Sequence, residues 1–127
     1  MVQAPTILVV DDEVGVATLL AELLADEGYR TTTARNGAEA LDKVRASAPD
    51  LVITDFMMPI RNGLELCYTL QADPRTRTIP IILISAVADQ IPPDLIEADA
   101  MLAKPLDFDA LLACVATLLR RPTPAAG

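Results

Sequence analysis

The chain has 127 residues, 52% of them hydrophobic and 22% charged, which is enough apolar material for the core of one domain. Its formal net charge of −8 argues against direct binding of nucleic acid or of an anionic membrane, because both need clustered Lys and Arg. No apolar run reaches the ~18 residues of a membrane span and no secretory signal precedes the first apolar run, so we expect a cytoplasmic protein.

Short apolar runs alternate with helical patterns along the whole chain. The apolar runs predicted as strands are Thr6–Val10, Leu51–Thr54, Ile81–Ile84 and Ala100–Ala103. Arg30–Ala34, which is rich in β-branched threonine, is predicted as a more exposed strand. Apolar residues at helical spacing occur over 16–24, 38–44, 64–70 and 108–119, and a short helix is predicted over 94–98. Gly28 is expected to end the first helix and Asp107 to cap the last.

This alternation predicts an α/β fold, a doubly wound five-stranded parallel sheet covered on both faces. We favour the flavodoxin-like strand order 2-1-3-4-5, whose switch point lies between the first and third strands. The fourth helix is expected to be shortened or irregular, because Pro92 and Pro93 stand where it should begin. Residues 1–120 are predicted to form the domain, and the Pro-rich residues 121–127 a flexible tail or the start of a linker.

Residues suited to phosphoryl chemistry stand at the carboxyl ends of the predicted strands. Asp11 and Asp12 follow the first strand, and Asp55, Ser85 and Lys104 follow the third, fourth and fifth. In this fold those ends meet at one edge of the sheet, where ligand sites form. Clustered carboxylates call for a cation, and oxygen ligands without histidine favour Mg²⁺. An Asp beside such a cation and a lysine suits the formation of an aspartyl phosphate.

Four motifs occur at these strand ends: VVDDE, ITDFMMPIRNGLEL, ILISA and AKP. Together with the segment DPRTRTIP they resemble the receiver domain of two-component response regulators, the CheY-like superfamily, over about Ile7 to Leu119. The resemblance implies a phosphoprotein that takes its phosphoryl group from a histidine kinase or a histidine phosphotransfer protein. It also implies a protein that changes its binding to a downstream protein and catalyses only its own phosphorylation and dephosphorylation. Because no output domain follows in this sequence, we expect a single-domain regulator or a fragment cut at the linker-like tail.

The resemblance assigns a role to each acidic residue of the site. Asp55 is the phosphoacceptor, and Asp12 and Asp55 ligate Mg²⁺ together with the backbone carbonyl of Met57. Asp11 is implied to hold the metal through a water molecule.

The resemblance also assigns the remaining site residues. Ser85 matches the hydroxyl residue that bonds the phosphoryl oxygens, and Lys104 matches the phosphate-binding lysine, with a cis peptide bond to Pro105. Ser85 would move inward on phosphorylation, followed by the residue at position 101, which is usually aromatic in the family. Here that residue is Met101, which defines two states less sharply than a rigid ring.

Other interpretations stay open at this point. Each site residue alone has a plainer role, since Asp pairs after strands commonly form turns or helix caps. A phosphohydrolase of the haloacid-dehalogenase type would carry Asp-x-Asp after the first strand, whereas this chain has adjacent Asp11 and Asp12. A flavodoxin would need a phosphate-binding loop and aromatic residues for a flavin, and a receiver that no longer uses phosphate would serve as an interaction platform.

Overall fold

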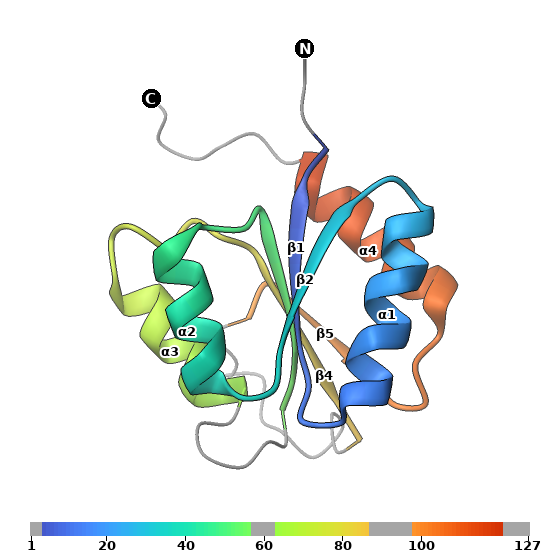
Figure 1. The fold of residues 1–127 in the computed structure, drawn as a ribbon, viewed down its shortest axis with the longest axis horizontal. Helices are drawn as coiled ribbons and strands as arrows, with labels where there is room; N and C mark the ends of the chain where they lie inside the picture. Colours follow the sequence, from blue (N-terminus) through green and yellow to red (C-terminus); the bar gives the residue numbers. More distant parts are fainter. Residues whose placement is uncertain (1–3, 57–62, 87–97, 121–127) are drawn as a thin grey trace.

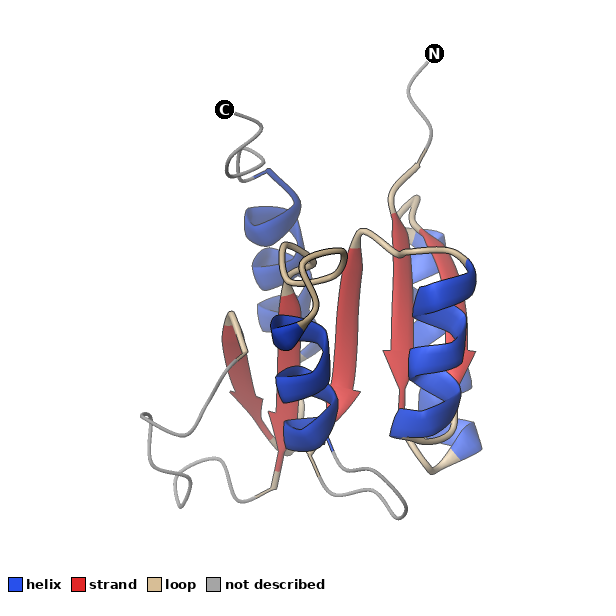
Figure 2. Cartoon of the chain, turned by 90° about the vertical axis from the view of Figure 1, so that its left-hand side faces the viewer, coloured by secondary structure: helices blue, strands red, loops and turns tan. Residues whose placement is uncertain are grey.

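The fold was analysed in a computed structural model, which describes residues 4–56, 63–86 and 98–120. Its centre is a sheet of five strands in the order β2-β1-β3-β4-β5. All four pairings are parallel, and Figure 2 shows the strands running in one direction. The strands are β1 (Thr6–Val10), β2 (Arg30–Ala34), β3 (Leu51–Asp55), β4 (Ile81–Ser85) and β5 (Ala100–Ala103). The strand order predicted from the sequence is therefore confirmed.

Helices cover both faces of the sheet. Figure 1 shows α1 (Val14–Asp26) and α4 (Phe108–Arg120) on one side, and α2 (Gly37–Ala46) and α3 (Gly63–Ala72) on the other. The short helix predicted over 94–98, with Pro92 and Pro93 before it, falls almost entirely outside the described residues. Within the described ranges, no helix combines the length and the apolar character needed to span a membrane.

Local signals set the ends of the helices. The Asn36 side chain caps α2 by accepting a hydrogen bond from the Glu39 N–H at 2.8 Å. Asp107 caps α4 in the same way, accepting from the Asp109 N–H at 3.0 Å. The chain leaves α1 through Gly28, whose φ of +97° lies in the left-handed region that glycine adopts readily. The predicted stop at Gly28 and the predicted cap at Asp107 are confirmed.

The core consists of two aliphatic layers, one on each side of the sheet. Alternate strand residues point to opposite faces, so Leu8 packs toward α2 and α3 while Ile7 packs toward α1 and α4. On α1 the buried residues are Ala17, Leu20, Ala21 and Leu24. The apolar stripe of α1 is wider than this buried face, because Leu19 remains 56% exposed and Val16 37% exposed.

Carboxylates also fix the amino ends of the strands, away from the predicted site. Asp50, just before β3, accepts the Thr6 N–H at 2.7 Å, and its own N–H donates to the Thr6 carbonyl at 2.8 Å. Asp99, just before β5, makes the same pair of bonds with Ile81 at 2.8 and 2.9 Å. Each pair joins the first residue of one strand to the residue that precedes its neighbour.

Candidate functional site

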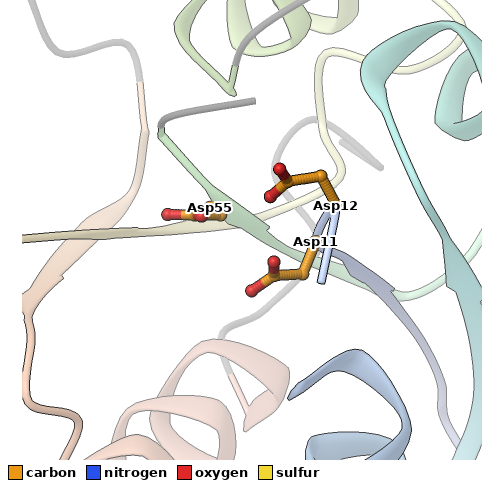
Figure 3. A group of neighbouring side chains, drawn as sticks. All are labelled: Asp11, Asp12 and Asp55. Atoms are coloured by element: carbon orange, nitrogen blue, oxygen red, sulfur yellow. The ribbon is translucent and has the colours of Figure 1, made fainter. Parts of the chain in front are cut away.

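Three carboxylates meet at the carboxyl ends of β1 and β3. Asp11 and Asp12 directly follow β1, and Asp55 is the last residue of β3, which pairs with β1. One carboxylate oxygen from each of the three lies within 4.8 Å of the others. Figure 3 shows the three side chains at the ends of these two neighbouring strands. The switch point of the sheet thus brings together the acidic residues that the sequence singled out.

Burial of the three acids is unequal and shapes their electrostatics. Asp11 and Asp55 are buried, whereas Asp12 is exposed. Burial raises the pKa of Asp11 above its usual value of 3.8, and the charges of Asp55 and Asp12 raise it further. The Glu13 N–H, which donates to Asp11 Oδ1 at 2.9 Å, and the Lys104 charge oppose that rise. The negative charge of the three carboxylates is therefore only partly offset by the Glu13 N–H and the Lys104 ammonium.

Lys104 supplies the cation beside this cluster. Its Nζ lies 3.3 Å from Asp55 Oδ1, and the lysine side chain is 35% exposed against 8% for the aspartate. The Lys104 N–H donates to the Ser85 carbonyl at 3.0 Å, which ties the end of β5 to the end of β4. The Lys104–Pro105 peptide bond is cis, the isomer that the family resemblance implies. At 3.3 Å, the Lys104 ammonium lies next to the carboxyl group expected to react.

Ser85 and Met101, the two predicted switch residues, lie on the adjacent strands. Ser85 is the buried last residue of β4, one position after Ile84, the register partner of Asp55. Met101 lies in β5 and packs partly buried against the layer below α2 and α3. Ser85 thus stands at the strand end next to the site, Met101 lies two residues before the end of β5 opposite Leu83, and their motion on phosphorylation stays a prediction. Met57, predicted to ligate the metal through its carbonyl, lies outside the described residues.

The donor set of the site fits a hard divalent cation. It offers carboxylate oxygens from Asp11, Asp12 and Asp55 within reach of one another, and the chain has no histidine. Exposed Asp12 also leaves one side of the cluster open to solvent. Magnesium ions commonly keep several water ligands, so partial exposure suits them.

A groove beside the site was not predicted from the sequence. It measures about 340 Å³, and the α1 residues Val16, Leu19 and Leu23 form one wall. The opposite wall comes from the segment that joins β5 to α4, including Leu106 and Phe108. Asp11 and Lys104 line it as well, so the groove opens directly onto the acidic cluster. Helical periodicity identified these α1 residues as apolar, but periodicity alone does not tell which of them the core leaves uncovered.

Comparisons with known proteins agree with the fold. Residues 7–116 match the family described as the response regulator receiver domain. The signal receiver domain of a signal transduction histidine kinase from Syntrophus aciditrophicus is 35% identical, with a TM-score of 0.83, over 94% of this chain and 96% of that one. The response regulator protein TrrA from Thermotoga maritima, solved in complex with Mg(2+)-BeF, is 38% identical, with a TM-score of 0.82, over 90% of this chain and 98% of that one.

A curated response regulator is similar to this chain over part of its own length. The DNA-binding response regulator MtrA from Mycolicibacterium paratuberculosis is 39% identical over 120 residues, which are 91% of this chain and 51% of that protein. The chain thus spans about half the length of the curated relatives it matches.

Proposed function

This chain belongs to the family of response regulator receiver domains, and we propose that it is a switch in which Asp55 accepts a phosphoryl group from a phosphohistidine on a kinase or phosphotransfer protein. Phosphorylation would then change its binding to a downstream protein. The observation that carries the proposal is the buried Asp55 carboxyl, paired with Lys104 at 3.3 Å and clustered with Asp11 and Asp12. On this proposal the chain catalyses only its own phosphorylation and dephosphorylation.

The transfer itself follows from the position of Asp55. A carboxylate oxygen of Asp55 attacks the phosphorus as the bond from phosphorus to the donor histidine nitrogen breaks, and the electron pair of that bond stays on the nitrogen. Lys104 starts beside Asp55 and offsets the negative charge of the transferring oxygens. Buried Ser85 lies at the neighbouring strand end, where its hydroxyl is proposed to bond a phosphoryl oxygen.

The negative charge of the acidic cluster has to be offset by a cation before a phosphoryl anion can approach. Asp12 and Asp55 would hold Mg²⁺ directly, with the Met57 carbonyl, and Asp11 would hold it through a water molecule. When bound, the ion offsets the charge of the carboxylates and of the incoming phosphoryl group. The complex of the Thermotoga maritima relative with Mg(2+)-BeF supports this assignment.

The α1 groove is proposed as the place where the donor protein docks. Its walls are apolar, and Leu19 and Val16 are exposed at 56% and 37%. Because Asp11 and Lys104 line the same groove, a partner seated in it reaches the phosphoacceptor. Exposed apolar patches of this kind mark protein contact sites.

Intact-mass measurement after incubation with Mg²⁺ and acetyl phosphate tests the phosphoacceptor. Wild type is expected to gain one phosphoryl group, Asp55→Asn none, and Asp42→Asn, a matched change on exposed α2, the same as wild type. A phosphorylated Asp55→Asn variant, or full modification of wild type in excess chelator, would overturn the proposal.

A second experiment separates docking from chemistry. Leu19→Asp is expected to slow phosphorylation by a phosphorylated histidine kinase domain that modifies the wild type, and to leave phosphorylation by acetyl phosphate unchanged. Tyr68→Asp is the control, because Tyr68 is 51% exposed on α3, on the opposite face of the sheet. Equal rates of protein-mediated transfer in both variants would exclude the groove as the docking site.

A further inference from the structure

Among the strands that the structure describes, β2 forms one edge of the sheet and pairs with β1 alone. The Arg30 N–H and the Ala34 carbonyl are both bonded on the β1 side. Backbone groups alternate along a strand, so the N–H and C=O groups of Thr31 and Thr33 face outward. An outward row of this kind is a template on which another strand can pair.

Two α2 side chains occupy part of this edge. The Lys43 ammonium donates to the outward carbonyl of Thr33. Glu39 Oε1 accepts the Arg35 N–H, which also faces outward, at 3.2 Å. Glu39 and Lys43 are one helical turn apart and form an ion pair at 3.8 Å.

These contacts reproduce those of a strand. An added strand would donate to the Thr33 carbonyl and accept the Arg35 N–H in either direction, through one residue if parallel and through two residues if antiparallel. Lys43 supplies the donor and Glu39 the acceptor at the same two positions. We propose that the Glu39–Lys43 pair closes the open edge of β2 against strand addition by a second copy of this chain.

A second copy is the partner that this edge fits, because a two-fold axis pairs a strand with itself in antiparallel fashion. The run Thr31–Thr33 is uncharged and β-branched, which favours strand pairing. In a pairing centred on Thr32, Thr31 of each copy would bond Thr33 of the other, and half of the hydrogen bonds would end on a Thr33 carbonyl. Lys43 occupies that carbonyl in the isolated chain.

A groove lies between the amino half of β2 and the end of α2. It measures about 740 Å³ and is lined by Thr31, Thr32, Lys43 and Ser47, among others. The contacts of Glu39 and Lys43 thus cover the carboxyl half of the edge, and the amino half borders this groove.

Helix capping is the plainer role for Glu39. Its N–H is already bonded to the Asn36 side chain at 2.8 Å, and its carboxylate lies near the start of α2. Capping does not account for Lys43, which lies two turns into the helix region and bonds another element. The two roles predict different results, because a lost cap lowers stability without creating self-association.

Sedimentation equilibrium of the full chain distinguishes them. Two variants open the edge: Glu39→Ala with Lys43→Ala, and Lys43→Met, which keeps Glu39 and so preserves α2 if the double variant folds poorly. The control, Asp42→Ala with Arg45→Ala, removes the same charges from exposed α2 positions. Circular dichroism reports whether each variant is folded.

Folded edge variants are expected to dimerise at least about tenfold more strongly than wild type, since each regained hydrogen bond contributes modestly. The control should match wild type. Adding Thr33→Pro to either edge variant removes an outward N–H and no bond to β1, and is expected to restore the monomer. Folded edge variants that stay monomeric, or dimers that survive Thr33→Pro, would overturn the proposal.

Discussion

The two ends of the sheet use the same residue type in opposite ways. At the amino ends, Asp50 and Asp99 each accept one backbone N–H from a neighbouring strand and return one to its carbonyl. At the carboxyl ends, Asp11, Asp12 and Asp55 lie within 4.8 Å of one another, with the Lys104 ammonium 3.3 Å from Asp55.

The difference lies in what each carboxylate has to bind. Backbone donors satisfy Asp50 and Asp99 locally, so these residues fix strand register. Like charges crowd the other group, and burial raises the pKa of Asp11. Aspartates at one end of the sheet therefore stabilise the fold, while those at the other end retain capacity for a cation and a phosphoryl group.

Loss of the Lys104 charge is the largest expected effect. Lys104→Met should slow phosphorylation by acetyl phosphate about 100-fold, the scale measured when one group that stabilises a transition state is removed. Arg30→Met, which removes a cation near the amino ends, should leave the rate unchanged. The rates are followed by intact mass. An equal loss of rate in both variants would show that the Lys104 charge has no special role at the carboxyl ends.

Magnesium should stabilise one end alone. A hundredfold excess of Mg²⁺ over its Kd is expected to raise the free energy of unfolding by about 2.7 kcal/mol. Asp12→Asn should lose most of this gain and Asp50→Asn should keep it. Urea unfolding with and without chelator measures the gain, and retention of the full effect in Asp12→Asn would contradict the ligand assignment.

Removing a carboxylate at the amino ends should weaken the fold and spare the chemistry. Asp50→Ala leaves the Thr6 N–H without its carboxylate acceptor, and we expect a loss of about 1–2 kcal/mol in the free energy of unfolding. Phosphorylation of the folded variant should proceed at the wild-type rate. A variant of unchanged stability would show that the reciprocal pair contributes little to register.

Removing a carboxylate at the carboxyl ends should raise the stability of the fold, and this is the smallest of the expected effects. In chelator, Asp11→Asn is expected to raise Tm by about 3 °C, because Asn still accepts the Glu13 N–H and carries no charge.

The pH dependence of this gain follows from the raised pKa. Folded Asp11 holds its proton more tightly than the unfolded chain does, so the free energy of unfolding falls as the pH rises from 3.8 to the raised folded pKa, and the loss is complete above it. The advantage of Asp11→Asn should be full at neutral pH and shrink as the pH falls toward 3.8, the usual value. A gain independent of pH in thermal unfolding would assign it to packing instead of charge.

The sequence predicts most of the fold because its signals are local. The bounds of β1, β2 and β5 agree with the predicted strands, and the predicted cap at Asp107 follows from residue type. Strands β3 and β4 each extend one residue further, to Asp55 and Ser85. Those polar residues end the apolar runs but remain in the hydrogen-bonded ladder, which hydropathy does not reveal.

The site was predictable as a set of residues and not as an environment. Strand order places Asp11, Asp55 and Lys104 together, since each stands at a carboxyl end. The α1 groove and the contact between Lys43 and Thr33 depend on how far each helix extends over the sheet. That distance is set by tertiary packing, for which a single sequence carries no periodic signal.

The alternation of β5 side chains between the two faces of the sheet affects which partner proteins can bind at the same time. Met101 packs into the layer below α2 and α3, whereas its neighbour Leu102 packs into the layer below α1 and α4. The α1 groove, proposed above as the docking site of the donor, lies on the second layer, so that site and the proposed Met101 response lie on opposite faces of the sheet. A downstream protein that binds the face of the sheet on which Met101 packs is not expected to compete with the donor. A displacement assay between the two proteins can check this. The donor and the downstream protein could then bind at the same time. The phosphoryl group could return to its donor while the downstream protein is still bound.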